Sequence, residues 1–249
     1  MIVRIETHCH SCYSHDSGLS VENIAKAAKK TGLTHILVCD HDRYGMSPVD
    51  KDLFLSYGIK LVNGIEFTTK EGVHIIGVHD DIHTIERPAH TYTIRELMDE
   101  LGIIGAISII PHPEHETGII GNKKVLPDDA DYAFSKAQFL EISNYKYGEC
   151  CYRNITNKYP HLKLLIGSDA HSLKSVAAYY NEFELSYESS NPLEKIIGSD
   201  AFIKHIYSKQ HIGLFFIKKK IKRTMVYQCI MHIIPSNLRR KIKNKFLNI

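Results

Sequence analysis

The sequence predicts an α/β protein whose mostly parallel sheet closes, or nearly closes, into a barrel. Two observations carry this prediction. Short, β-branched apolar runs alternate with segments of helical periodicity along residues 1–208, and about seven such runs are present. Polar residues that can bind a metal follow nearly every run, whereas an open doubly wound sheet would gather its ligands at one switch point. A chain of 249 residues with 43% hydrophobic content can bury one core of this size.

The expected elements follow from local patterns. A helix over residues 20–30 is predicted because Ser20 can serve as its N-cap and Gly32 is suited to end it. Further helices are expected at residues 94–101, 147–158 and within 192–208, and residues 49–57 are expected to be helical or irregular. A long polar loop with turn signals at Gly118, Gly121 and Pro127 is expected before residue 138. Strands are expected at residues 2–5, 35–39, 60–62 with 65–68, 72–78, 106–110, 138–142 and 162–166, with an edge strand at 179–185.

Composition narrows the class of protein. No apolar run reaches the ~18 residues of a membrane span, and the N-terminus lacks the features of a signal peptide, so a cytoplasmic protein is expected. Cys9 and Cys12 have a C-x-x-C spacing, but no second pair completes a zinc site. The six cysteines are therefore interpreted as reduced thiols.

Residues 209–249 differ from residues 1–208 in charge. They contain no acidic residue and 11 of the 31 Lys+Arg residues. From Ser236 onward the apolar residues fall on one helical stripe surrounded by basic residues, which predicts a basic amphipathic helix. The stripe consists of Leu238, Ile242, Phe246 and Ile249. We therefore expect a barrel domain over residues 1–208 and a basic helical tail over 209–249.

Three interpretations of this tail remain open. The preferred one is attachment to an anionic membrane surface, which would make the protein peripheral on the inner face of the membrane. The second is binding to a nucleic acid or a protein partner through the basic residues. The third is a helix that packs on the barrel. The oligomeric state is not indicated by the sequence.

Two segments that follow predicted strands carry a metal-binding pattern. His8 and His10 follow the strand at residues 2–5, and Asp169 and His171 follow the strand at residues 162–166. Residues i and i+2 of an extended chain point the same way, so each pair presents two donors on one face. A single His-x-His pair is weak evidence, because 16 histidines in 249 residues make about one such pair expected by chance. The support comes from the other strand ends.

Nine residues at strand ends are candidate metal ligands. Imidazoles and carboxylates without a thiolate suit zinc, manganese or iron. Nine donors are too many for one ion, so two or three clustered divalent metal ions are expected, with Glu66 as the bridging carboxylate. The candidates are His8, His10, Asp16, His41, Glu66, His74, His112, Asp169 and His171.

Six segments resemble, in order, the motifs of the PHP (polymerase and histidinol phosphatase) domain family, in its short stand-alone form. They are HCHSCYSHD (8–16), CDHD (39–42), GIE (64–66), VHIIG (73–77), IPHP (110–113) and GSDAHS (167–172). The resemblance covers about residues 1–208 and implies a distorted seven-stranded TIM-like (β/α)7 barrel with a trinuclear metal site for phosphoester hydrolysis. Two positions depart from the family pattern. Glu6 stands where the family usually has Asp, and Ser17 precedes the Gly that usually follows the Asp directly.

The mechanism that this resemblance implies is metal-ion hydrolysis. Clustered cations lower the pKa of a bridging water from ~15.7 towards ~7 and orient the phosphoester for in-line attack. The leaving group then needs a proton donor, for which the candidates are Asp40, Asp42, His15 and His115. The remaining phosphate oxygens need a cation, and Arg43 is the candidate.

Three functions remain open on the sequence. The preferred one is a metal-dependent phosphoesterase, either a phosphatase or a phosphodiesterase, that acts on a small phosphorylated substrate. The second is an amidohydrolase-like enzyme that cleaves C–N bonds, because that barrel also begins with His-x-His and ends with an Asp at a strand end. The third is a non-catalytic module that holds metal and is targeted by its basic tail.

Overall fold

The computed structural model of the protein describes residues 1–142 and 152–208, and the account below concerns the unit Met1–Ile206 with the end of its last strand. The predicted tail at 209–249 and the first part of the helix predicted at 147–158 lie outside the described residues. The strands are β1 (Ile2–Cys9), β2 (His35–His41), β3 (Lys60–Thr68), β4 (His74–Val78), β5 (Ile107–Ile110), β6 (Phe139–Ile142), β7 (Lys163–Ile166), β8 (Tyr179–Glu184) and β9 (Lys204–Tyr207). The helices are α1 (Val21–Thr31), α2 (Pro48–Ser56), α3 (Ile94–Ile103), α4 (Pro127–Lys136), α5 (Arg153–Lys158), α6 (Pro192–Ile196) and the 3-10 helix η1 (Ile82–Ile85).

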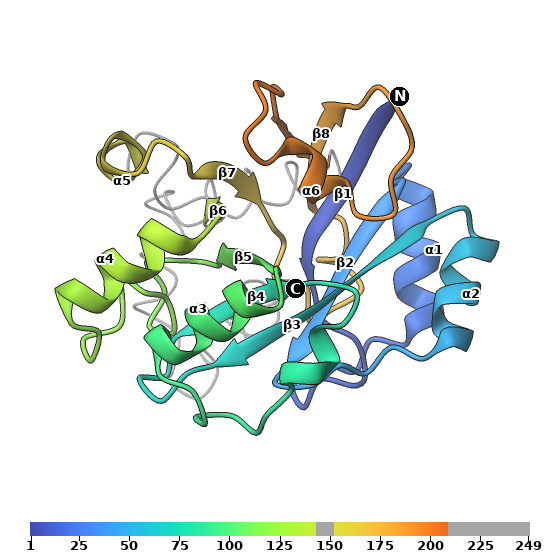
Figure 1. Ribbon diagram of the computed structural model, residues 1–249. Coiled ribbons are helices and arrows are strands. Elements are labelled where there is room, and N and C mark those ends of the chain that lie inside the picture. The colour runs from blue at the N-terminus through green and yellow to red at the C-terminus, as the bar shows by residue number, and fades with distance from the viewer. Residues whose placement is uncertain (143–151, 209–249) are drawn as a thin grey trace, which may run out of the picture. The chain divides into compact units, whose positions relative to one another are not determined.

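The strands form one sheet in the order β7-β6-β5-β4-β3-β2-β1-β8-β9 (Figure 1). β1, β2 and β3 pair in parallel, as do β5, β6 and β7. β4 is antiparallel to both of its neighbours, and β8 is antiparallel to β1. The prediction of a mostly parallel sheet therefore holds for two blocks and not at β4. Only residues 69–73 connect β3 to β4, and so short a connection can form a hairpin but not the crossover that a parallel pair needs.

The two ends of the parallel blocks meet at β1 and β7. Cys9 forms an isolated parallel bridge with Ala170, and Thr7 Oγ1 donates to Ile166 O at 3.1 Å. The buried Asn181 of β8 lies across the remaining gap. Its Nδ2 donates to Ile166 O and its Oδ1 accepts from Ile166 N, both at 2.9 Å. The sheet is thus a nearly closed barrel, as predicted, with nine strands instead of seven because β8 and β9 continue it beyond β1.

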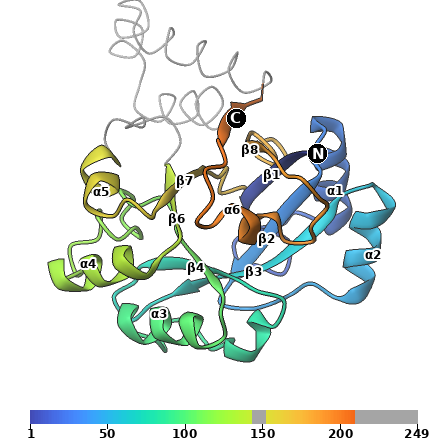
Figure 2. The same ribbon diagram turned by 45° about the horizontal axis from the view of Figure 1, so that its top comes forward.

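Apolar side chains fill the barrel and also line its outer face. The interior cluster takes alternate residues from successive strands, among them Ile5, Leu37, Val62, Ile76 and Phe139. On the outside, α1 and α2 pack beside β1–β3, and α3 and α4 pack beside β4 and β5 (Figures 1 and 2). No helix among residues 1–142 and 152–208 has the length and apolar character that a membrane crossing needs.

The helix ends show why the local predictions succeeded where they did. The side chain of Ser20 accepts a hydrogen bond from Asn23 N at the start of α1, and Gly32 takes a left-handed φ of 80° just after its end. Ser47 and Asp50 form a capping box that begins α2. The segment at residues 49–57, expected to be helical or irregular, is therefore a helix.

Two expectations were wrong. The long polar loop before residue 138 contains α4, which begins with Pro127 at its first turn and carries Asp128 and Asp129 there. The residues from 192 to 208 form only the short helix α6, and β9 follows after a turn in which Gly198 has φ of 67°. A glycine at positive φ interrupts a helix, and Lys204–Tyr207 beyond it join the sheet next to β8 instead.

Candidate metal centre

The alternation of side chains along the strands carries polar residues to one rim of the barrel. Cys39 faces the interior, and His41 lies two residues further along β2. Val62 likewise precedes Glu66 by four residues on β3, so both point the same way. Because β4 runs antiparallel, its first residue, His74, reaches this rim instead of its last one.

A bulge in β1 decides which way the His-x-His pair points. Val3 and Ile5 face the interior, so unbroken alternation would point Thr7 inward and His8 outward. The pairing of β1 with β2 shifts between Glu6 and Cys9, however, and Cys9 packs in the outer cluster beside α1. The shift reverses the alternation and turns His8 and His10 inward, which is a frequent use of bulges next to functional sites.

The first group of donors surrounds the Nε2 atoms of His8 and His10, which lie 3.1 Å apart. Glu66 Oε2 is 3.1 Å from the Nε2 of His8 and 3.0 Å from that of His10. Asp169 Oδ1 lies 3.4 and 3.3 Å from the same two nitrogens. Four donor atoms thus converge on one position, from β1, the residue directly after it, β3 and the segment after β7.

The other oxygen of Glu66 faces different histidines. Its Oε1 is 3.1 Å from His74 Nδ1 and 3.0 Å from His112 Nε2. His41 Nδ1 lies 3.6 Å from Glu66 Oε2, and His41 also belongs to a compact donor group with Glu66 and His74. The carboxylate of Glu66 therefore stands between two sets of imidazoles.

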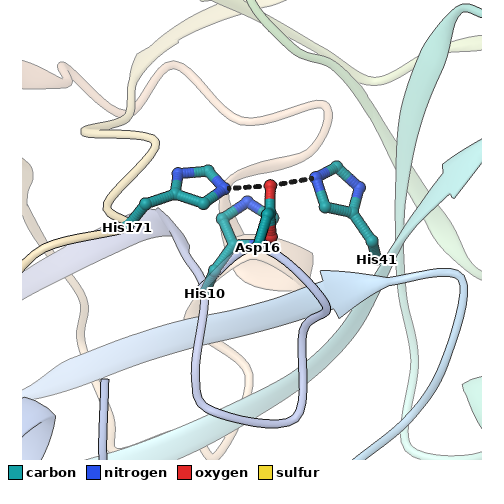
Figure 3. A group of neighbouring side chains, drawn as sticks. All are labelled: His10, Asp16, His41 and His171. Atoms are coloured by element: carbon teal, nitrogen blue, oxygen red, sulfur yellow. Dashed lines mark ion pairs between the residues drawn. The ribbon is translucent and has the colours of Figure 1, made fainter. Parts of the chain in front are cut away.

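A third group lies around Asp16 (Figure 3). Asp16 Oδ2 is 2.9 Å from His171 Nε2 and 3.4 Å from His41 Nε2. The ring of His10 stacks on that of His171 with 4.2 Å between centroids and completes this group of four. The structure thus brings together all nine predicted ligands, and their role as ligands stays a prediction.

The donor set fits divalent cations. Ligands at about 2.0–2.2 Å from a tetrahedral or octahedral metal lie about 3.0–3.5 Å from one another, which is the spacing observed in the first two groups. His41 Nδ1 and His171 Nε2 are buried and lack a hydrogen bond of good geometry among the described residues, although both face carboxylates. A buried nitrogen without a partner costs about 1–3 kcal/mol, and coordination to a cation would remove that cost.

The electrostatics of the centre favour positive charge. Burial alone would raise the pKa of Glu66, but His8, His74 and the hydrogen bonds from His10 and His112 hold it well below its usual value. Burial opposes a proton on His10, yet its contacts with Asp169 and Glu66 raise its pKa to about 9. Burial has the opposite effect on His41, whose pKa it lowers to about 4. A divalent cation would displace any proton on the nitrogens that bind it, because metal ligands must be deprotonated.

The centre is buried on the side of His8, His10 and Glu66 and open to solvent on the side of Asp16, Asp169 and His171. The side chains of His8, His10 and Glu66 are at most 1% exposed, whereas those of Asp16, Asp169 and His171 are 37, 39 and 30% exposed. A small molecule would therefore approach past Asp16, Asp169 and His171.

The predicted auxiliary residues occupy different surroundings. Both carboxylate oxygens of the buried Asp40 accept hydrogen bonds from Ser11, at 2.6 Å from its N and 2.7 Å from its Oγ, so Asp40 anchors the loop after β1. Arg43 is exposed, and none of the hydrogen bonds or ion pairs among the described residues engages its guanidinium. His115 is exposed with its ring 5.6 Å from that of His112, and the ring of His15 is 5.2 Å from that of His41. The catalytic roles of Asp40, Arg43 and His115 stay predictions.

Sequence reasoning missed two features of the site. Glu141 of β6 is buried, and its Oε2 lies 2.9 Å from His8 Nδ1. The signal that could have revealed it is a carboxylate two residues after Phe139 on an otherwise apolar strand. Ser14 was also missed, and its hydroxyl donates to Asp16 Oδ1 at 2.8 Å.

The fold and the donor set place the protein in the class of α/β-barrel metal-dependent hydrolases. The family model of the PHP domain matches residues 6–228, and the chain belongs to this family.

Three individual similarities accompany this assignment. An uncharacterized protein of Methanocaldococcus jannaschii is 30% identical over 123 residues, which cover 45% of this chain and 68% of that protein. A 5'-3' exoribonuclease of Haemophilus influenzae is 31% identical over 84 residues, and the match spans 32% of this chain and only 30% of the exoribonuclease. The crystal structure of a lesion-specific endonuclease, EndoQ of Pyrococcus furiosus, superposes with a TM-score of 0.64 at 20% identity over 82% of this chain and 58% of that chain.

Proposed function

We propose that the protein is a metal-dependent phosphoesterase that uses two or three clustered divalent ions, zinc, manganese or iron, to hydrolyse a small phosphorylated substrate. The observation that carries this proposal is the position of Glu66. Its two oxygens face two different sets of imidazoles at 3.0–3.1 Å, which is the arrangement that a bridging ligand between neighbouring cations needs. His8, His10 and Asp169 would hold one ion, His74 and His112 a second, and Asp16, His41 and His171 a third.

When bound, clustered cations supply Lewis acidity that activates water and neutralises charge on phosphoryl oxygens. The chain's own residues supply the remaining functions. Arg43 follows His41 by two residues, and its guanidinium makes no hydrogen bond or ion pair among the described residues, although its charge partly offsets the rise that burial causes in the pKa of the nearby Asp40. Its N–H groups can therefore bind phosphate oxygens. His115 borders His112 and is exposed, so it is our choice as proton donor to the leaving group.

The segment of Arg43 is held on both sides. Asp42 accepts hydrogen bonds from Thr68 N at 2.6 Å and Thr68 Oγ1 at 2.9 Å. On the other side, Tyr44 N donates to Glu86 at 2.8 Å and Tyr44 OH donates to Asn63 at 2.9 Å. Because its two neighbours are fixed, Arg43 loses little backbone freedom when it binds a substrate, which favours binding.

The substrate class is tested with a panel of esters. The matched relatives include a nuclease of RNA, so nucleotides and short RNA join histidinol phosphate, a phosphotyrosine peptide and p-nitrophenyl mono- and diesters. Purified protein is depleted with a chelator and assayed after addition of manganese, zinc or iron. We expect at least two ions per chain and metal-dependent release of phosphate or alcohol. His8→Ala should bind fewer ions and lose this hydrolysis. Less than one ion per chain together with no manganese-stimulated hydrolysis would refute the proposal. Turnover of an amide without turnover of any phosphoester would favour the C–N hydrolase instead.

Arg43 provides a second test of the same function. Hydrogen bonds to charged groups contribute about 1.5–3 kcal/mol, so Arg43→Ala should lower kcat/KM for a phosphoester about ten- to hundredfold without changing the metal content. Arg43→Lys should restore part of the loss, because lysine keeps the charge but not the bidentate geometry. Arg95→Ala on the outer helix α3 is the control and should retain full activity. Unchanged kcat/KM in Arg43→Ala would remove Arg43 from the site.

A further inference from the structure

Glu141 is a buried carboxylate that none of the predicted ligand or catalytic roles uses. It lies on β6 with 2% of its surface exposed. Its Oε2 is 2.9 Å from His8 Nδ1, and its Oε1 accepts a hydrogen bond from the backbone N of His112 at 3.3 Å. One carboxylate therefore contacts two residues that face different oxygens of Glu66.

The contact with His8 determines which nitrogen of the imidazole is free. A carboxylate at His8 Nδ1 favours the tautomer that carries its proton there. The lone pair is then on Nε2, which faces Glu66 and Asp169. A carboxylate on the far nitrogen of a ligating histidine fixes the orientation of the ring and increases its basicity.

The contact with His112 supports a strained backbone. His112 has φ of 26°, a conformation that residues other than glycine rarely adopt, and it lies in the turn after β5. Its Nε2 must nevertheless reach Glu66 Oε1 at 3.0 Å. The hydrogen bond from His112 N to Glu141 holds the turn in this conformation.

The chain also leaves room for this carboxylate. A Cβ at Gly167 would overlap Glu141 Oε2 and would lie 2.7 Å from His8 Cβ. Glycine at position 167 therefore allows the segment after β7 to lie directly against Glu141 and His8. Three elements, β1, β6 and the end of β7, are thus fitted around one interaction.

We infer that Glu141 is a positioning residue that holds two neighbouring metal positions, the one at His8, His10 and Asp169 and the one at His74 and His112. It has no contact with Asp16, His41 or His171 among the described interactions, so the third position does not depend on it. This inference rests on the proposed function, because it assumes that these groups bind cations.

The test uses the full-length protein, stripped with a chelator and titrated calorimetrically with Mn²⁺ or Zn²⁺. Glu141→Gln keeps the size of the side chain, but its amide offers one acceptor oxygen where the carboxylate offers two. The metal affinity of two binding steps, those at the His8 and His74 positions, should fall about 10–100-fold, and the affinity of the third step should not change. Glu141→Asp keeps the charge and should recover part of the affinity. Glu182→Gln on β8, which pairs with Arg4 and contacts none of the nine donors, should bind as the wild type does.

Thermal melting of the same proteins separates positioning from a structural role. We expect the chelated Glu141→Gln protein to melt within a few degrees of the chelated wild type, while the rise in Tm on adding metal becomes smaller. Wild-type affinity in both Glu141 variants, or equal weakening of all three steps, would overturn the inference. If Glu141→Gln does not fold, the same comparison is made with Glu141→Asp, and wild-type affinity there overturns it. A wild type that binds no metal would instead refute the proposed function.

Discussion

Two buried histidines on one strand show how surroundings decide the role of a residue. His35 begins β2, and its ring nitrogens pair with Thr34 Oγ1 at 2.8 Å and Ser189 O at 2.9 Å. His41 ends the same strand, and its Nδ1 has no hydrogen bond to any residue that the structure describes, although Glu66 lies 3.6 Å away. The position after the apolar run marked His41 as a ligand candidate in the sequence. Thr34 directly precedes His35, but Ser189 lies 154 residues further along the chain, and no local pattern could have shown that second partner.

The stability contribution of His35 should depend on pH. Burial lowers the pKa of His35 in the folded protein, so the unfolded chain takes up a proton first as the pH falls. The contribution of the neutral, buried ring is fully present above pH ~6.5, the ordinary pKa of histidine, and is lost as the pH falls towards the folded value. We expect the difference in unfolding free energy between the wild type and His35→Gln to shrink between pH 7 and pH 5 in urea titrations with a chelator present. A difference that grows as the pH falls would contradict this.

At the scale of elements, the strand ends were predictable and their detailed geometry was not. The apolar runs located β2, β3 and β7, and the polar residues after them formed the centre. The bulge in β1 was not predictable, because it is a property of the pairing with β2 and not of the residues Glu6 to Cys9 alone. Helix α4 was missed because Pro127 also suits a turn, and only the two aspartates after it favour a helix start.

Gly167 provides a test at this scale. Gly167→Ala would push its Cβ into Glu141 and His8, and overpacking of this kind typically costs about 1–3 kcal/mol. We expect a lower free energy of unfolding in urea and weaker metal binding in the same variant. Gly18→Ala is the matched control, because nothing lies within 4 Å of its added Cβ. Equal stability of the two variants would show that the segment after β7 can move aside freely.

At the scale of the whole molecule, the barrel is closed by side chains where the strands do not pair continuously. The resemblance of the motifs predicted the barrel, but the joint between β1 and β7 depends on Asn181, which lies on a strand that sequence analysis placed only at an edge. Asn181 is fully buried, and both the Nδ2 and the Oδ1 of its side chain form hydrogen bonds with the backbone of Ile166. A hydrogen bond between a side chain and the backbone of a distant residue leaves no pattern in the local sequence that could predict it.

Asn181→Ala should therefore destabilise the fold. It leaves the buried N–H of Ile166 without its partner, and an unsatisfied buried group costs about 1–3 kcal/mol. Urea unfolding of the chelated protein measures the loss directly. Asn23→Ala on the exposed face of α1 is the control, and its free energy of unfolding should stay within about 0.5 kcal/mol of the wild type. A cost in Asn181→Ala no larger than in the control would mean that the other contacts, Thr7 with Ile166 and Cys9 with Ala170, secure the joint.

The joint between β1 and β7 would also govern when the protein can bind the proposed cations. His8 and His10 are synthesised some 160 residues before Asp169 and His171, which share their donor groups. A cation held by both would staple the beginning of the barrel to its end and close a very long loop in the chain. A nascent or truncated polypeptide that stops before β7 lacks Asp169 and His171. It would therefore bind the cation more weakly than the complete barrel does.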